Sequence, residues 1–388
     1  MDFMEGSSES VVSNLKHALD MEPPPSSSSS SSGKNGEVLL SNLRLLSRAL
    51  VGEGAPSSSS SDGDHHGGLS GDTELCAMTV LLKSSGVIVR LLEQVRILGF
   101  ENRKELAVIF KSLMRKNPES FVEYLVQEDQ VHVVDALWAG YAEAEAALSC
   151  GVMLRSAVRH VSFAAAVLRR PSLWAVLDEY IHDPGFDVAS DAFNTLVELV
   201  MGPHEDLCAT FLGERFEDFF GRFESLLLSE NYMVRRRSLK LLGELLLRRS
   251  NMHVMRRFVG SKHFLKVIML LLRDKSSNIQ FEAFHVFKIF VANPDKQSDI
   301  IEVLVRNKSK LISYLDGFRA TLSKDKDKEK SDAAAQLEHE KEMLIKILGN
   351  LPDESSLGQC GTSPSTTLVP DDSAACTSTP PVRAPSIA

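Results

Sequence analysis

Apolar residues between about Glu74 and Leu351 recur at spacings of three and four, and short turns rich in Asp, Asn, Gly, Pro or Ser interrupt them. Such spacing gathers the apolar side chains on one face of an α-helix, whereas a half-buried β-strand alternates apolar and polar residues. No convincing alternating stretch occurs in this region. The pattern therefore predicts an all-α fold in which each amphipathic helix buries one face against its neighbours.

A degenerate repeat underlies these helices. Five segments share a turn followed by apolar or small residues seven, ten and thirteen positions after an anchor, the anchors being Phe100, Ala144, Phe186, Tyr232 and Ile279. Successive anchors are 44, 42, 46 and 47 residues apart, within the range of armadillo and HEAT repeats. Examples of the sets are Phe193, Leu196 and Leu199; Leu239, Leu242 and Leu245; and Val286, Ile289 and Ala292. We therefore predict an armadillo/HEAT-like helical-repeat solenoid with one concave and one convex surface, a shape suited to binding.

Composition divides the chain into three parts. Residues 1–74 hold helix-like pieces such as VVSNLKHAL, separated by Ser/Pro/Gly-rich stretches at about 21–36 and 52–72 that are expected to be flexible inserts. Residues 75–351 form the expected helical-repeat scaffold domain. Residues 352–388 are rich in Ser, Thr and Pro and are expected to be a disordered tail.

Charge and cysteine content narrow the function classes. A net charge of −9 and a pI near 5.7 argue against general nucleic-acid binding in this 388-residue chain. The five cysteines are widely spread without CxxC spacing, which favours a reducing compartment over a disulfide framework or a zinc site. Neither a signal peptide nor a long apolar segment is evident, so we expect a soluble cytoplasmic protein without membrane insertion.

The sequence contains no motif that indicates a catalytic residue, a cofactor site or a metal site. No P-loop, complete GxGxxG, HExxH or GxSxG is present. His65 and His66 lack further ligands at useful spacing, and His160 and His285 fit core or capping positions better. The run KDKDKEKSD at 324–332 lacks the glycine and closing glutamate of a calcium loop. The sequence therefore argues against an enzyme.

The segment 231–260 departs from the overall acidity. It contains eight Lys or Arg residues and one acid, Glu244, for a local charge of +7. On a helix Tyr232, Arg236 and Lys240 form one stripe, while the neighbouring leucines face the core. From the pattern alone, a solvated helix face is the favoured interpretation. The alternatives are a site for a protein partner and a nucleic-acid-binding solenoid; Arg235 and Arg237 are interpreted as flanking charge.

Longer stretches carry a family resemblance. SENYMVRRRSLKLLGELLL from Ser229 and NIQFEAFHVFK from Asn278 closely resemble the mouse-protein-25 family, also called calcium-binding protein 39. The resemblance covers roughly 75–320 well and 11–350 overall. It implies a curved helical scaffold without catalytic activity, which binds STRAD-type pseudokinases or germinal-centre/sterile-twenty-class protein kinases and stabilises their active conformation. No motif in the sequence supports calcium binding, despite the family name.

The resemblance also implies two partner-binding surfaces. A concave basic surface corresponds to Phe186, Tyr232, Arg236, Lys240 and Arg249, with Met252 where the family usually has an aromatic residue. Met252 preserves apolar volume but lacks a rigid ring, which puts recognition of a third partner in doubt. A C-terminal pocket for a Trp-Glu-Phe-like peptide tail corresponds to Lys266, Met269 and Arg306. Met269 fits either the pocket wall or the ordinary core.

Overall fold

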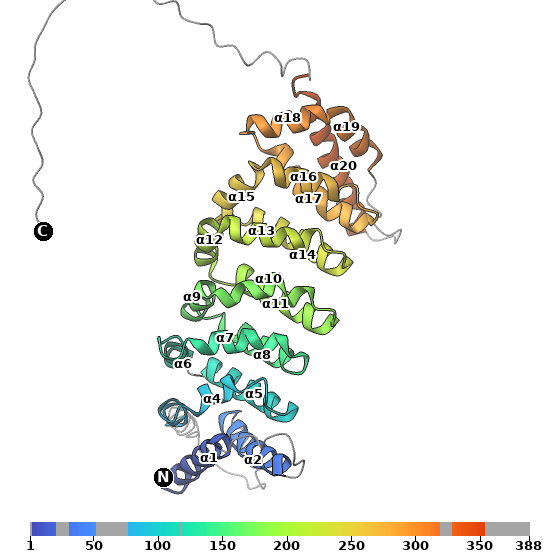
Figure 1. The fold of residues 1–388 in the computed structure, drawn as a ribbon. Helices are drawn as coiled ribbons and strands as arrows, with labels where there is room; N and C mark the ends of the chain where they lie inside the picture. Colours follow the sequence, from blue (N-terminus) through green and yellow to red (C-terminus); the bar gives the residue numbers. More distant parts are fainter. Residues whose placement is uncertain (1, 21–30, 52–76, 117, 319–327, 354–388) are drawn as a thin grey trace, which may run out of the picture.

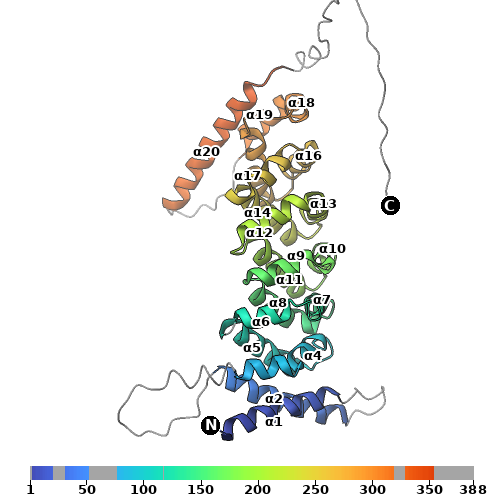
Figure 2. The same cartoon turned by 90° about the vertical axis from the view of Figure 1, so that its left-hand side faces the viewer.

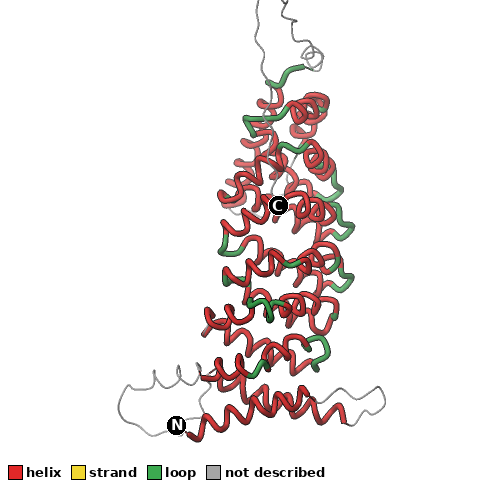
Figure 3. The backbone as a smooth tube through the Cα atoms, turned by 60° about the vertical axis from the view of Figure 1, so that its left-hand side comes forward, coloured by secondary structure: helices red, strands yellow, loops and turns green. Residues whose placement is uncertain are grey.

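The computed structural model describes residues 2–20, 31–51, 77–116, 118–318 and 328–353. Within these ranges every regular element is a helix and none is a strand, as Figure 3 shows. The elements stack into an elongated array in which N-terminal and C-terminal helices lie at opposite ends (Figures 1 and 2). The predicted all-α solenoid is confirmed.

One column of long helices runs the length of the array. These helices are α2 (Ser31–Val51), α5 (Phe100–Lys116), α8 (Ala144–Ala157), α11 (Phe186–Met201), α14 (Tyr232–Leu247), α17 (Ser277–Ala292) and α20 (Lys328–Gly349). Within the column, α2 packs on α5, α5 on α8, α8 on α11, α14 on α17 and α17 on α20. We call this set the long-helix column.

The remaining helices, most of them shorter, complete each layer. One group comprises α1 (Asp2–Asp20), a helix at 77–84, α4 (Val87–Glu93), α7 (His132–Ala139), α10 (Trp174–Asp178), α13 (Phe216–Leu227), α16 (Lys262–Leu271) and α19 (Lys308–Gly317). The edge opposite the long-helix column in Figure 1 carries α6 (Pro118–Leu125), α9 (Val161–Arg169), α12 (Glu205–Glu214), α15 (Met252–Val259) and α18 (Ser298–Arg306). Short 3-10 turns are η1 (Gly140–Ala142), η2 (Pro171–Leu173), η3 (Tyr180–His182) and η4 (Arg249–Asn251).

The repeat anchors coincide with helix starts in four of five cases. Phe100, Ala144, Phe186 and Tyr232 are the first residues of α5, α8, α11 and α14, but α17 begins at Ser277, two residues before Ile279. The apolar set counted from Ile279 was therefore wrong in part: Ala292 is exposed and Ile289 only partly buried. The same steps from Ser277 reach three fully buried residues, Phe284, Phe287 and Phe290. Ile279 is the first apolar residue of the helix, whereas the turn ends at Ser276.

The N-terminal boundaries differ slightly from those expected. Because α2 begins at Ser31, residues 31–36 belong to a helix rather than to the insert predicted at about 21–36. Residues 21–30, the second insert at 52–72 with His65 and His66, and the tail beyond residue 353 lie outside the described residues.

A buried polar cluster joins η1, which directly precedes α8, to α11. Asp191 is 8% exposed and accepts a hydrogen bond from the hydroxyl of Tyr141 to Oδ2 at 2.7 Å. Thr195 lies beside them, with Oγ1 2.7 Å from the Tyr141 hydroxyl. Burial raises the pKa of Tyr141, so its hydroxyl stays protonated and remains a donor. Each buried polar atom named here has a partner, which makes this boundary between repeats rigid and specific.

Candidate partner-binding surface

The helix α14 presents two different faces. Its N-cap is Asn231, whose side-chain oxygen accepts hydrogen bonds from Met233 N at 2.9 Å and Val234 N at 3.4 Å. Leucines fill the buried face, namely Leu239, Leu241, Leu242, Leu245 and Leu246. The side chains of Arg236 and Lys240 remain 43% and 67% exposed. The predicted division of this helix into a core face and a basic face therefore holds.

Tyr232, Arg236 and Lys240, which we call the α14 stripe, lie alongside polar residues of the next repeat. The Tyr232 hydroxyl accepts a hydrogen bond from Asn278 Nδ2 at 3.0 Å. Arg236 Nε lies 3.9 Å from Glu282 Oε1 in α17, and Lys240 Nζ lies 3.9 Å from Glu244 Oε1. Ion pairs at this distance whose cation is largely exposed are weak, so the two cations stay available to a stronger partner.

Two pKa shifts describe the electrostatics of this face. The hydrogen bond from Asn278, with the nearby charge of Arg236, lowers the pKa of the Tyr232 hydroxyl. Burial raises the pKa of the Glu282 carboxyl, although Arg236 and Lys240 oppose that rise. Glu282 is therefore a poorly solvated counter-ion that orients Arg236 without neutralising the whole stripe.

Phe186 lies on the adjoining repeat. It is the first residue of α11 and is 65% exposed. A small cavity of about 30 Å³ separates this end of α11 from the start of α14; it is lined by Phe186, Ala189, Ser190, Phe193, Asn231, Met233, Val234 and Arg237. The structure thus places Phe186 beside the N-terminal end of α14, where the α14 stripe begins.

Arg249 and Met252 lie beyond the opposite end of α14. Arg249 belongs to η4 and is exposed, and its side chain forms no hydrogen bond or ion pair within the part of the chain that the structure describes. Met252 begins α15 and is 44% exposed. Both side chains are accessible, but their placement extends the predicted surface past the stripe rather than joining it.

Arg235 and Arg237, interpreted from the sequence as flanking charge, have structural roles instead. Arg235 Nη1 lies 3.4 Å from Asp274 Oδ2, and both side chains are largely buried. Arg237 donates to Asn194 Oδ1 at 2.6 Å and stacks over the ring of Phe193. The interpretation was wrong because these contacts are made to the following and preceding repeats, and no local spacing in the sequence signals them.

The residues predicted for the C-terminal pocket come from α16 and α18. Met269 is partly buried against the core, and Lys266 is exposed on the same helix. Arg306 Nη2 pairs with Glu302 Oε1 at 2.6 Å, and Lys262 Nζ lies 3.1 Å from Glu302 Oε2. The hydrogen bond from Lys262 and the charges of Arg306 and Lys266 lower the pKa of Glu302. One carboxylate therefore sits among three cations, a net positive patch beside the partly buried Met269.

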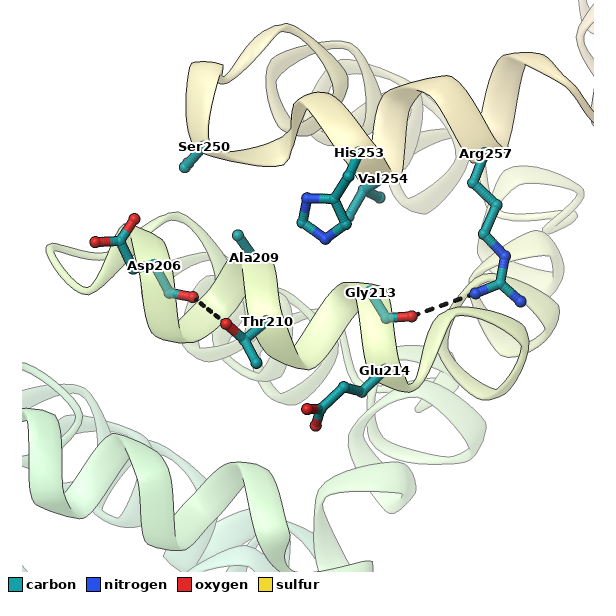
Figure 4. Close-up of a pocket in the computed structure, with 9 residues that line it drawn as sticks. All are labelled: Asp206, Ala209, Thr210, Gly213, Glu214, Ser250, His253, Val254 and Arg257. Carbon is teal, nitrogen blue, oxygen red and sulfur yellow. Dashed lines mark hydrogen bonds between the residues drawn. The ribbon is translucent and has the colours of Figure 1, made fainter.

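A separate groove of about 520 Å³ lies between α12 and α15, on the edge opposite the long-helix column (Figures 1 and 4). His253 covers Gly213, and Arg257 Nη1 donates to the carbonyl oxygen of Gly213 at 3.3 Å. Asp206 and Glu214 flank the groove on α12. None of the residues predicted from the sequence as binding residues lines it.

The described residues contain no group of three or more His, Cys, Asp or Glu side chains arranged to hold a metal ion. No helix in the described ranges combines the length and apolar character needed to cross a membrane.

Known proteins resemble the chain over most of its length. Residues 6–352 match the family described as Mo25-like. A Mo25-like protein of Schizosaccharomyces pombe is 44% identical over 231 residues, covering 59% of this chain and 69% of that protein. The human protein named calcium-binding protein 39-like is 40% identical over 273 residues, covering 70% of this chain and 77% of that protein. Among solved structures, an engineered protein aligns with a TM-score of 0.42 and 14% identity over 74% of this chain and 97% of that chain.

Proposed function

The chain belongs to the Mo25-like family, and on that basis we propose that it binds and allosterically activates germinal-centre/sterile-twenty-class protein kinases or a STRAD-like pseudokinase. The family consists of non-enzymatic scaffold proteins, so the activation proposed here comes from binding alone. We place this action in cytoplasmic signal transduction.

The α14 stripe is the observation that carries the proposal. A tyrosine and two cations share one accessible helix face, held in place by Asn278 and Glu282 of α17. Arginine and tyrosine are the side chains that most often dominate protein–protein binding energy, and an arginine fork matches a carboxylate. Phe186 supplies an exposed aromatic ring on the neighbouring repeat. These features support a protein partner with acidic and apolar groups.

Activation would follow from selective binding. A rigid scaffold that contacts the active arrangement of a kinase more extensively than the inactive one shifts the kinase population toward the active state. The size of the shift is limited by the difference between the two binding free energies, and a factor of about 100 in affinity corresponds to roughly 2.7 kcal/mol. The layered packing of α8 on α11 and of α14 on α17 supplies stiffness on each side of the α11/α14 boundary.

The cluster of Lys262, Lys266 and Arg306 supports a second contact. Three cations around the single carboxylate of Glu302 suit an acidic peptide, and Met269 offers apolar surface on the same helix as Lys266. A Trp-Glu-Phe-like tail combines those two chemistries. The proposed partner therefore engages the scaffold at both the α14 stripe and this C-terminal patch.

The contacts of the arginines in 231–260 argue against the alternative function, a nucleic-acid-binding solenoid. Arg235, Arg237, Arg248 and Arg257 all make hydrogen bonds or ion pairs to other repeats. Binding to phosphates requires several cations that are free to displace counter-ions together. The positive charge of this segment that remains exposed and without a hydrogen bond to another repeat is the α14 stripe with Arg249 and Arg256, which fits a protein surface better than a nucleic-acid backbone.

The test uses purified components. The full chain and an Arg236→Ala, Met269→Ala double variant are each titrated with a panel of purified sterile-twenty-class kinases and a STRAD-like pseudokinase, and kinase activity is measured with each. The matched control is Arg256→Ala, Leu270→Ala, which removes an exposed arginine and an exposed apolar residue elsewhere on α15 and α16. We expect only the first double variant to lose binding and activation. Equal binding by all three proteins would contradict the surface assignment, and no binding by any would contradict the function.

A further inference from the structure

The long-helix column is interrupted at one boundary. Its other neighbouring helices pack directly against each other, including α8 on α11 and α14 on α17, whereas α11 and α14 approach each other much less closely. The cavity of about 30 Å³ described above lies at this boundary. Because the backbones of α11 and α14 make fewer close approaches than those of the other neighbours, fewer contacts resist their relative movement. The α11/α14 boundary is therefore the loosest junction of the column from α2 to α20 in the described residues.

Arg237 spans this gap from the α14 side. Its Nη1 donates to Ser190 Oγ at 3.2 Å and to Ser190 O at 3.4 Å, while Nη2 donates to Asn194 Oδ1 at 2.6 Å. The guanidinium lies 4.2 Å from the centroid of the Phe193 ring. A planar fork that is hydrogen-bonded on one side and stacked on a ring has one favoured position. Arg237 thus fixes the N-terminal part of α14 to the middle of α11.

Arg248 makes the second bridge, at the other end of the same helix. It follows α14 directly, and its Nη2 donates to Met201 O at 2.8 Å and to Gly202 O at 3.4 Å. Its Nη1 donates to Val200 O at 3.4 Å. These are carbonyls at the C-terminal end of α11, where a helix presents unpaired acceptors and partial negative charge. Two arginines therefore hold both ends of α14 to α11.

At the same level of the array, the helices outside the long-helix column remain in contact. The helix α10 packs on α13, and α9 packs on α12. Helices α9 and α10 therefore contact α12 and α13 directly, whereas α11 and α14 are joined mainly by bridging side chains. Such an arrangement is that of a hinge, with its axis on the side of the direct helix contacts. Opening at the α11/α14 boundary would separate Phe186 from Tyr232, because these residues begin the two helices that border it.

We propose that the α11/α14 boundary is a hinge, and that Arg237 and Arg248 are positioning residues that hold Phe186 at the spacing from the α14 stripe that a partner requires. The second half of this statement rests on the proposed function, whereas the hinge itself does not. Neither arginine needs to touch the partner. Their effect on affinity comes from keeping the two parts of one surface in register before binding.

The hinge is tested by distance measurements on the full chain. Spin labels are placed at the exposed residues Leu148 and Leu247 across the boundary, and a same-side pair at Lys104 and Leu148 serves as reference. Cys76, Cys360 and Cys376 are replaced by serine in all proteins; Cys150 and Cys208 stay, because both are buried and burial raises their pKa values to about 12 and about 11.

Arg237→Met and Arg248→Met, singly and together, are compared with Arg257→Met in double electron–electron resonance. Arg257 is a matched control, since it also stacks 4.2 Å from a phenylalanine centroid and donates to a carbonyl, but at the α12/α15 groove. We expect the Leu148–Leu247 distance distribution to broaden in the Arg237 and Arg248 variants and the Lys104–Leu148 distribution to stay unchanged. An unchanged Leu148–Leu247 distribution in the Arg237→Met, Arg248→Met double variant would refute the hinge.

The positioning role is tested by adding a purified kinase that binds the unaltered protein. We expect the Arg237→Met, Arg248→Met variant to bind the kinase about five- to tenfold more weakly, which is within the usual range of conformational coupling free energies. Saturating kinase should then narrow the Leu148–Leu247 distance distribution to that of the unaltered protein. Unchanged affinity despite a broadened distribution would overturn the positioning role while leaving the hinge and the proposed function intact. If no kinase or pseudokinase binds the unaltered protein, the proposed function and the positioning role fail together, and the distance measurements still decide the hinge.

Discussion

Arg155 of α8 and Asp191 of α11 form a two-armed ion pair across a repeat boundary, with Nη2–Oδ1 at 2.7 Å and Nη1–Oδ2 at 2.9 Å. Burial of Tyr141 and Thr195 beside the pair closes the cluster against water. The same two helices also pack directly on each other. This boundary therefore has both interlocked surfaces and a satisfied polar cluster, in contrast to the bridged gap between α11 and α14.

Gly151 makes room for this cluster, and we predict that Gly151→Ala destabilises the protein by about 2–3 kcal/mol, the upper part of the usual range for overpacking. A methyl group at Gly151 would overlap Asp191 Oδ2 and the Tyr141 hydroxyl and would lie 2.9 Å from Arg155 Nη1. The free energy of unfolding in urea measures the effect. Gly221→Ala is the control: no atom lies within 4 Å of a methyl group there, so alanine should stabilise α13 by about 0.5–1 kcal/mol. Equal effects of the two substitutions would contradict this explanation.

Removing the charge of Asp191 should cost more than removing a surface carboxylate. Asp191→Asn keeps the size of the side chain but leaves Arg155 with an uncompensated, largely buried charge, for an expected loss of about 3 kcal/mol. Asp218→Asn breaks the exposed pair with Arg215 and should cost at most about 1 kcal/mol. Urea unfolding of the two variants compares them directly. A loss at Asp191 no larger than that at Asp218 would show that the cluster contributes little.

Arg236 is expected to dominate binding at the α14 stripe. Arg236→Ala should weaken binding of a purified sterile-twenty-class kinase by about tenfold or more, as at other arginine hot spots, whereas Arg256→Ala on α15 should change it by less than about twofold. Isothermal titration at two salt concentrations measures both effects, because a charged contact loses affinity as salt rises. The prediction fails if the two alanine variants bind alike.

Glu302 is expected to compete with an acidic ligand for the C-terminal cations. Glu302→Gln removes the carboxylate that pairs with Lys262 and Arg306, so a peptide ending in Trp-Glu-Phe should bind about two- to fivefold more tightly. Fluorescence anisotropy with a labelled peptide provides the measurement. Glu224→Gln, which breaks a pair with His263 instead, is the control and should leave the affinity unchanged. Weaker binding by Glu302→Gln would contradict a purely competitive role.

His285 should make the C-terminal repeats sensitive to acid. Burial, with the nearby charge of Lys288, lowers the pKa of this histidine, and Glu340 opposes the shift only in part. The unfolded chain, with an ordinary histidine pKa of about 6.5, therefore takes up the proton first as pH falls. The stability contributed by the neutral ring is present above that value and is lost progressively below it.

We therefore predict that the free energy of unfolding falls less between pH 7.5 and pH 5.5 in His285→Gln than in the unaltered protein. The exposed His253→Gln serves as the control, and its pH dependence should match the unaltered protein. A pH dependence in His285→Gln as steep as that of the unaltered protein would exclude this histidine as the cause.

Periodicity was sufficient to predict the repeat architecture because each helix buries its own regularly spaced residues. It placed the starts of α5, α8, α11 and α14 correctly, and it separated Arg236 from the core face of its helix. It misplaced the start of α17 because Ile279 is apolar and Ser277 is not. A helix begins where its cap ends, so the first apolar residue is an unreliable marker of the boundary.

The periodicity of apolar residues could not predict the contacts between repeats. Three adjacent arginines look equivalent in the sequence, yet Arg235 pairs with Asp274, Arg236 lies near Glu282, and Arg237 bonds to α11. Those partners lie one repeat ahead or behind, at positions that a degenerate period of 42 to 47 residues does not align reliably. The α11/α14 gap was hidden for the same reason, because it concerns how two correctly predicted helices meet.

The C-terminal helix α20 has a consequence for the array as a whole. It packs on both α17 and α19, and its residues Leu337, Leu344 and Leu348 are buried. Lys288 Nζ of α17 donates to Glu340 Oε2 at 2.8 Å, and Figure 2 shows α20 lying obliquely beside the other C-terminal helices. A stacked array otherwise ends in an open apolar face that invites another copy to continue the stack. Because α20 shields that face of α17, end-to-end polymerisation through it is blocked. This face of α17 is therefore closed by a helix of the same chain rather than by a further repeat or a second copy.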